Sequence, residues 1–163
     1  MSAECGYLRA GRMNSVTVII PAYNAEVCLG RCLESVFAQN HIPQQVIVVN
    51  DGSTDATRKI AYGYAKRIEY FENQNQGPGA SRNQGLTIAR GDYIAFLDAD
   101  DYWSPSFLSS CLNFFEKHID AVAVTTGQIH KLWGHGEVIR PEFLQKPNCP
   151  QQPFIIKDFF SFG

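Results

Sequence analysis

GDYIAFLDADD, residues 91–101, places an apolar run directly before a cluster of three aspartates, Asp98, Asp100 and Asp101. The run at residues 93–97 has the length and composition of a buried β-strand. Like charges this close repel one another and raise each other's pKa, so the cluster costs stability unless a cation lies beside it. The stretch therefore predicts a buried strand whose end binds a divalent metal ion.

A regular alternation of apolar runs and helical stripes extends outward from this stretch. Short β-branched or apolar runs predict strands, and apolar residues at helical spacing predict helices. Pro21, which lacks an N–H, is expected to end the first strand. Because the two kinds of segment alternate, we predict an α/β fold, with a mostly parallel, Rossmann-like sheet and helices on both faces. The predicted strands are residues 16–20, 45–49, 68–71, 93–97 and 121–125, and the predicted helices are residues 27–37, 54–66, 80–89 and 107–118.

A polar segment follows each of the first four predicted strands. These segments are PAYN (residues 21–24), NDGSTD (residues 50–55), NQGPGASRNQG (residues 75–85) and DADD (residues 98–101). Ligands of open parallel sheets bind outside the carboxyl ends of the strands. We therefore expect the four segments to converge at one edge of the sheet and to form a single site.

The NDGSTD segment contains both capping residues and a candidate ligand-binding carboxylate. Ser53 or Thr54 can cap the helix that follows, and Asp55 is favourable near its N-terminus. Asp51 precedes these residues, at the end of the strand. A carboxylate there can accept a hydrogen bond from a base or a ribose, so we favour a binding role for Asp51.

Residues 77–85, GPGASRNQG, combine a flexible turn with the start of a predicted helix. Exposed N–H groups and the helix dipole favour anions at such a place, and Arg82 adds a fixed positive charge. A pyrophosphate would suit this segment. A glycine-rich loop that merely carries a surface arginine is the alternative.

Asp98 and Asp100 are separated by one residue, so a turn after the strand can aim both carboxylates at one ion. Hard oxygen ligands suit Mg²⁺ or Mn²⁺, which bind through one or two carboxylates together with substrate phosphates. The alternative, an acidic turn that caps the next helix, accounts for Asp101 but not for all three acids. We therefore predict a Mn²⁺ or Mg²⁺ site.

The composition is that of one globular domain of 163 residues, 45% of them hydrophobic. Its 14 basic and 16 acidic residues are mixed along the chain and give no electrostatic footprint for nucleic acid or an anionic membrane. The five cysteines are odd in number and scattered, which predicts no disulfide framework and suggests a reducing compartment. No apolar run reaches the ~18 residues of a transmembrane segment.

The segments VTVIIPAYNAE, VIVVNDGSTDAT, NQGPGASRNQGL and GDYIAFLDADD together resemble the signature of family 2 glycosyltransferases. The match runs in order over residues 16–103, and the combination is far more specific than any one motif. The resemblance implies the GT-A nucleotide-sugar-binding fold. We expect residues 1–14 to be a poorly ordered extension and residues 15–163 to be a GT-A domain truncated in its acceptor-binding part.

The resemblance also implies roles for individual residues. Tyr23 would pack against the base, Asp51 would contact the base or its ribose, and Arg82 would help organise the acidic pocket near the diphosphate. Asp98 and Asp100 match the family's DxD pair, in which Asp100 would be the more direct metal ligand and Asp98 would lie near the ribose and the metal. The implied nucleotide-sugar-binding residues are Pro21, Ala22, Tyr23, Asn24, Asp51, Arg82 and Asp98, and the implied metal ligands are Asp98 and Asp100.

By the same resemblance, the reaction is an inverting transfer of a sugar from a nucleoside diphosphate donor, with UDP the commonest nucleotide, to an acceptor hydroxyl. The acceptor would be a sugar, a lipid-linked molecule or a polymer. In the family the general base lies farther beyond DxD than this chain extends, so we assign none; Glu137, Glu142 and Asp158 are acidic candidates in no recognised motif. The alternative function is a nucleotide-sugar-binding module without turnover.

Two other nucleotide-binding classes fit the sequence less well. A dinucleotide-dependent oxidoreductase needs GxGxxG directly after the first strand, where this chain has PAYNAE. A sugar nucleotidyltransferase is expected to carry a glycine-rich loop with a basic residue at the same place.

Because the chain shows no export signal, we expect a cytoplasmic protein, with a peripheral position at the inner face of a membrane as an open alternative.

Overall fold

The structure is a computed structural model that describes residues 14–126, 130–131 and 138–139. It divides into two compact units, Met1–Ser109 and Ser110–Gly163, which are described separately. The predicted extension, residues 1–14, and the acidic candidates Glu137, Glu142 and Asp158 lie outside the described residues, apart from Asn14.

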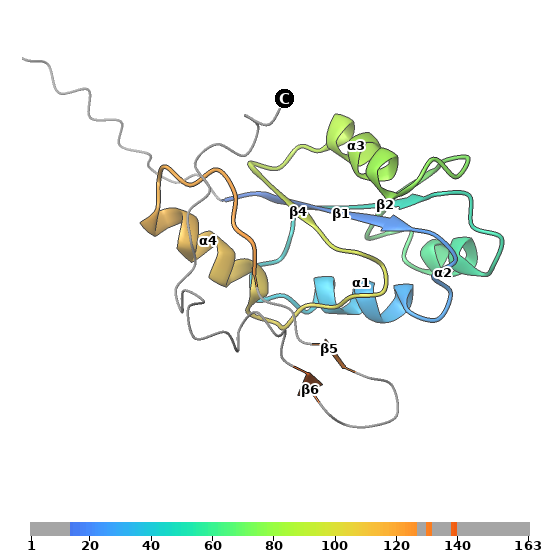
Figure 1. Cartoon of the computed structure of the whole chain (residues 1–163), viewed down its shortest axis with the longest axis horizontal. Coiled ribbons are helices and arrows are strands. Elements are labelled where there is room, and N and C mark those ends of the chain that lie inside the picture. Colours follow the sequence, from blue (N-terminus) through green and yellow to red (C-terminus); the bar gives the residue numbers. More distant parts are fainter. Residues whose placement is uncertain (1–13, 127–129, 132–137, 140–163) are drawn as a thin grey trace, which may run out of the picture. The chain divides into compact units, whose positions relative to one another are not determined.

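The first unit has strands and helices in strict alternation. Its four strands form one sheet in the order β3-β2-β1-β4, and every neighbouring pair is parallel. Figure 1 shows α3 on one face of this sheet and α1 and α2 on the other, which confirms the predicted α/β fold. The elements are β1 (Val16–Ala22), α1 (Leu29–Phe37), β2 (Gln45–Asn50), α2 (Thr57–Gly63), β3 (Glu69–Glu72), α3 (Pro78–Ile88) and β4 (Tyr93–Phe96).

The core lies around the two central strands. Every residue of β1 and of β2 is buried, as expected for parallel strands that are covered on both faces. The prediction that residues 93–97 form a buried strand is wrong in its burial, because β4 lies at one end of the strand order and exposes 37% of Ile94 and 45% of Phe96. On one face Ile19, Ile47 and Val49 form a cluster against which Ile88 and Ala89 pack. On the other face α1 buries Leu29, Cys32, Leu33 and Val36 of the apolar stripe predicted over residues 27–37. Val27, at the start of that stripe, precedes the helix and is 81% exposed.

Gly85 lets α3 approach the sheet closely. A Cβ atom at this position would lie 2.5 Å from Cγ2 of Ile19, a distance that real Cβ atoms do not show. Glycine in a helix interior costs about 1 kcal/mol relative to alanine, so its use here needs a packing reason. The contact with β1 supplies that reason, and it positions the start of α3 over the carboxyl end of the sheet.

The prediction that Pro21 ends the first strand is wrong, because β1 continues to Ala22. The carbonyl of Ile19 accepts a hydrogen bond from the N–H of Leu97, so residues 19 and 21 both direct their backbone groups to the β4 side. The pairing with β4 ends at Ile19. The missing N–H of Pro21 therefore removes no ladder bond.

The predicted cap of the second helix is also wrong. The helix α2 begins at Thr57, and neither Ser53 nor Thr54 caps it. Ser53 instead accepts a hydrogen bond from the N–H of Asn24, 2.9 Å away. The carboxylate of Asp55 accepts from the N–H of Thr57 at 2.9 Å, as its place near the helix start suggested. The side chain of Ser53 thus bonds to a residue of a neighbouring loop, and the spacing of residues in the sequence does not reveal this partner.

The second unit contains most of α4 (Phe107–Lys117) and an antiparallel pair, β5 (His130–Lys131) and β6 (Val138–Ile139). The predicted strand at residues 121–125 is wrong, since only an isolated bridge forms at Ala123. Val122 is 57% exposed there, so no sheet covers this apolar run. Among the described residues, no helix combines the length and the apolar character needed to cross a membrane.

We predict opposite effects from adding one methyl group at two glycines of α3. Gly85→Ala should lower the free energy of unfolding by about 1–3 kcal/mol, because the new Cβ overlaps Ile19. Gly79→Ala, with no atom within 4 Å of the new Cβ, should raise it by about 0.4–1 kcal/mol. Urea denaturation of both variants checks the contrast, and equal effects would contradict the packing account.

Candidate functional site

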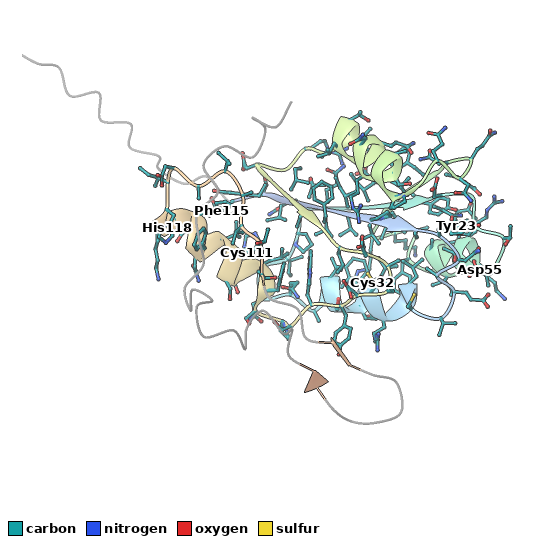
Figure 2. All side chains as sticks on the ribbon, in the orientation of Figure 1. Tyr23, Cys32, Asp55, Cys111, Phe115 and His118 are labelled. Carbon is teal, nitrogen blue, oxygen red and sulfur yellow. The ribbon has the colours of Figure 1, made fainter. Side chains whose placement is uncertain are left out.

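The carboxyl ends of the parallel strands carry the polar segments that the sequence singled out. Figure 2 shows Tyr23 and Asp55 at this end of the first unit, beyond the head of the β1 arrow. The loop after β1 is bonded to the loop after β2 in both directions. The N–H of Glu26 donates to Asp55 at 3.0 Å, and the N–H of Ala56 donates to the carboxylate of Glu26 at 2.9 Å. The two loops therefore form one connected surface.

Asn24 fixes the end of the PAYN segment. Its φ of +46° lies in the left-handed region, which asparagine tolerates better than most residues. Its side-chain oxygen accepts from the N–H of Thr54 at 3.0 Å, so the side chain is used to join the loops. Pro21 and Ala22 are buried within β1. Tyr23, which is 51% exposed, is therefore the PAYN side chain most open to a ligand.

Asp51 ties the loop after β2 to the loop before α3. It is only 3% exposed, and its two carboxylate oxygens accept from the N–H groups of Gln76 and Gly77 at 2.8 and 2.7 Å. Gly52 allows this approach, because a Cβ atom there would lie 3.0 Å from the backbone nitrogen of Asn75. These two hydrogen bonds explain how the carboxylate of Asp51 can be buried. The predicted contact of Asp51 with a base or ribose stays a prediction.

The aspartate cluster forms a tight turn directly after β4. The N–H of Asp101 donates to the carbonyl of Asp98 at 3.0 Å, which closes the turn. Asp98 and Asp100 are exposed, whereas Ala99 between them is 7% exposed and belongs to the core. The buried Ala99 thus holds the turn against the core, and the carboxylates of Asp98 and Asp100 lie outside the core.

Arg82 lies beside the turn, as the sequence predicted for a basic residue of an acidic pocket. Its guanidinium donates to Oδ1 of Asp98 at 2.5 Å, from a side chain that is 33% exposed. Asp98 is 50% exposed, and ion pairs this accessible contribute about 1 kcal/mol at most. Stability alone is therefore a weak explanation for the pair.

Two thiols of the first helix lie next to the acidic turn. The thiol of Cys32 donates to the backbone carbonyl of Asp98 at 3.7 Å. Burial raises the pKa of Cys32 to about 12, with the nearby Cys28 and the acidic side chains of the turn adding to the effect. Burial and then the charge of Asp100 also raise the pKa of Cys28. The raised pKa values keep both thiols neutral at pH 7, and Cys32 is fully buried as a small residue of the core.

A metal ion at the turn would need ligands from outside the protein side chains. Within the part of the chain that the structure describes, no group of three or more His, Cys, Asp or Glu residues is arranged to hold an ion. Mg²⁺ and Mn²⁺ do not require one, since they bind through one or two carboxylates and take phosphate oxygens and water as further ligands. Asp98 and Asp100 thus fit a metal that arrives with a phosphorylated ligand.

Sequence reasoning missed the residues that hold these loops together. Asn50 is fully buried, donates to the hydroxyl of Tyr70 at 2.8 Å and accepts from Ser53. No local pattern identifies such a partner 20 residues away. A pocket of about 440 Å³ also lies over the start of α2, and it includes none of the predicted site residues; its lining is Ser53, Asp55, Ala56, Arg58, Lys59 and Tyr62.

The chain is similar to known glycosyltransferases over most of its length. It is 40% identical over 111 residues to the putative glycosyltransferase EpsH of Bacillus subtilis, a match that covers 66% of this chain and 32% of the relative. The chain therefore spans about a third of that relative, and a smaller share of some others.

Solved structures agree with this similarity. S. aureus TarS 1–349 in complex with UDP-GlcNAc matches 81% of this chain and 38% of its own, with 27% identity and a TM-score of 0.60. The mannosyltransferase PcManGT from Pyrobaculum calidifontis, in complex with GDP-Man and Mn²⁺, matches 61% of this chain and 32% of its own, with 26% identity and a TM-score of 0.57.

The family model described as Glycosyl transferase family 2 matches residues 17–158, which is most of the chain. This range includes all four polar segments and the ion pair between Arg82 and Asp98. The chain therefore belongs to glycosyl transferase family 2.

Proposed function

We propose that this chain is the donor-binding part of an inverting glycosyltransferase that uses a nucleoside diphosphate sugar and depends on Mn²⁺ or Mg²⁺. The observation that carries the proposal is the ion pair between Arg82 and Asp98, in the same turn as Asp100. The ion pair brings the guanidinium of Arg82, which can bind a diphosphate, next to carboxylates that can bind a divalent ion. Membership of the family supplies the class of reaction.

The donor set of the turn fits a hard divalent ion. Arg82 bonds to Oδ1 of Asp98, so Oδ2 of the same carboxylate is available to an ion. Asp100 is exposed in the same turn and is proposed as the more direct ligand. When bound, the ion stabilises the negative charge that develops on the departing diphosphate. Arg82 adds a second, permanent positive charge and is oriented for that task by Asp98.

The nucleoside is proposed to lie over the loops that follow β1 and β2. Tyr23 offers an exposed ring on which a base can stack, and Asn24 holds the loop in position. Asp51 uses each carboxylate oxygen once, for Gln76 or Gly77, and each oxygen retains a lone pair for a base or ribose. Pro21 and Ala22, being buried, would contribute backbone rather than side-chain contacts.

The solved relatives support a nucleotide-sugar donor and a divalent ion. The TarS structure holds UDP-GlcNAc, and the PcManGT structure holds GDP-Man together with Mn²⁺. UDP is our first choice because the TarS match covers more of this chain.

A nucleotide-sugar-binding module without turnover is the second candidate function. The chain matches about a third of the B. subtilis relative, so turnover is a proposal for this chain rather than a property carried over from that relative. Release of labelled sugar from a UDP-sugar, with and without Mn²⁺, distinguishes the two functions. A pure binder would show metal-dependent affinity but no release.

We predict that Asp100→Ala abolishes Mn²⁺-dependent binding of a UDP-sugar. Loss of a direct ligand should weaken binding by at least about 100-fold, above the usual effect of an outer-shell partner. Glu69→Ala removes a carboxylate at the start of β3, away from the turn, and is the control, with affinity expected to change by less than about threefold. Calorimetric titration measures both, and an unchanged affinity of Asp100→Ala would refute Asp100 as a ligand.

We predict that Arg82→Gln changes nucleotide and metal binding in opposite directions. UDP affinity should fall by about tenfold or more, because a charged hydrogen bond to phosphate is lost. The affinity for Mn²⁺ alone should rise, because the arginine no longer competes for Asp98. Arg90→Gln, which breaks the separate ion pair with Glu69, is the control and should change neither. A parallel fall of both affinities in Arg82→Gln would contradict competition at Asp98.

A further inference from the structure

One side of α1 holds the chain segment that carries the acidic turn and continues beyond it, residues 98–108. The residues that do so recur at intervals of about four, so they lie on one stripe of the helix and just past its end. They contact the segment at several points along its length. The contacts are Cys32 to the carbonyl of Asp98, Arg31 over the ring of Tyr102, Ser35 to the N–H of Trp103, Gln39 to Ser104 and Leu108, and the N–H of Asn40 to the carbonyl of Pro105.

Gln39 makes the strongest of these connections. It is only 4% exposed, and its amide nitrogen donates to the carbonyl of Ser104 at 2.7 Å and to that of Ser35 at 3.1 Å. Its amide oxygen accepts from the N–H of Leu108 at 3.0 Å. When both the oxygen and the nitrogen of a buried amide bond to backbone groups, those groups are fixed in position. Any movement of the backbone would leave buried polar atoms without hydrogen-bond partners.

Ser35 completes the attachment one helical turn earlier. Its hydroxyl donates to the carbonyl of Cys32 at 2.7 Å and accepts from the N–H of Trp103 at 3.2 Å. The ring of Trp103 stacks on Phe107 with centroids 4.4 Å apart. The backbone that leaves the acidic turn is thus held at Trp103 and Ser104, a few residues after Asp100.

We propose that Gln39, assisted by Ser35, is a positioning residue for the metal-binding carboxylate of Asp100. The inference rests on the proposed metal-dependent function of the turn. Asp100 is exposed and lacks the packing that would hold it, so its direction depends on the backbone on both sides. On one side β4 pairs with β1, and on the other α1 holds residues 103–108 through Ser35 and Gln39.

A purely structural role is the competing explanation. Gln39 caps the start of α4 by accepting from the N–H of Leu108, and such a cap stabilises a helix wherever it occurs. The two explanations differ in what a substitution changes. A cap alone alters global stability, whereas a positioning residue alters metal affinity in molecules that remain folded.

Gln45 provides a matched control. It is also a buried glutamine, 5% exposed, with its amide oxygen accepting from Thr17 and Arg90 and its amide nitrogen donating to Glu69 and Ile88. It lies at the start of β2, the opposite end of the sheet from the acidic turn. Gln45→Met therefore removes a comparable set of hydrogen bonds without touching the segment that follows β4.

The first experiment uses the free protein and amide hydrogen exchange. Gln39→Met should accelerate exchange at the amides of Asp101, Trp103 and Leu108 by about tenfold relative to the amides of β2, because the local segment opens more often. Gln45→Met should not produce this local pattern. Uniform acceleration over the whole first unit in Gln39→Met would overturn the proposal in favour of the structural role.

The second experiment measures binding at a temperature at which each variant is folded. Gln39→Met should weaken Mn²⁺-dependent binding of UDP by about tenfold, the low end for groups that orient a ligand from outside the first shell. Its affinity for uridine, which has no phosphate, should stay unchanged. Gln45→Met should change neither affinity. If Gln39→Met does not fold, Ser35→Ala takes its place, with an expected loss of about threefold, since it removes a single neutral hydrogen bond.

The outcomes separate this inference from the function on which it rests. If the wild-type chain binds UDP no better with Mn²⁺ than without, the proposed metal-dependent function fails, and the positioning role fails with it. If the wild type shows metal-dependent binding and Gln39→Met and Ser35→Ala show it equally, only the positioning role fails. A selective loss of the metal-dependent part in these variants supports both.

Discussion

Mutual repulsion among Asp98, Asp100 and Asp101 is the constraint on which the arrangement of this site depends. Like charges repel one another more strongly near a protein surface than in bulk water, because the effective dielectric constant is lower there. The fold accepts this cost at the end of β4, where the turn is closed by a backbone hydrogen bond and anchored by the buried Ala99. Arg82 offsets part of it by pairing with Asp98. Under the proposed function, a divalent ion that arrives with a diphosphate would offset the remainder.

The rest of the first unit serves to bring these groups to one edge and to hold them there. Parallel pairing of β1 with β2 and β4 sends the loops to the same side, and Gly85 lets α3 lie close enough to β1 for Arg82 to reach the turn. Asp51 then connects two of the loops by accepting N–H groups with both oxygens. Ligand binding at such an edge needs little rearrangement, because the loops are already bonded to one another. Preorganised loops of this kind favour affinity by lowering the ordering cost of binding.

Sequence patterns predicted the elements better than they predicted the contacts between elements. The apolar runs identified β1 and β2 because a strand that is buried on both faces must be apolar nearly throughout. The runs at β3 and β4 also form strands, but both of these strands are partly exposed. The prediction that Pro21 ends the first strand failed for a non-local reason. A missing N–H disrupts a strand only where that N–H would pair, and the pairing of β1 with β4 has already stopped before Pro21. Ser53 was misread as a cap for a similar reason, since its partner Asn24 lies in another loop. Of the site, the resemblance indicated a role for Arg82 at the acidic pocket but not its partner, which is Asp98 in the structure. The attachment of Gln39 to Ser104 bridges 65 residues and leaves no local signal.

The central claim, that Asp98 and Asp100 share a divalent ion with the diphosphate of a donor, is tested most directly by anomalous diffraction from crystals grown with MnCl₂ and UDP. We expect one manganese peak in direct contact with a carboxylate oxygen of Asp100 and close to the diphosphate, with Arg82 still beside Asp98. UDP bound without a manganese peak at the turn, or manganese bound elsewhere with both carboxylates turned to solvent, would contradict it.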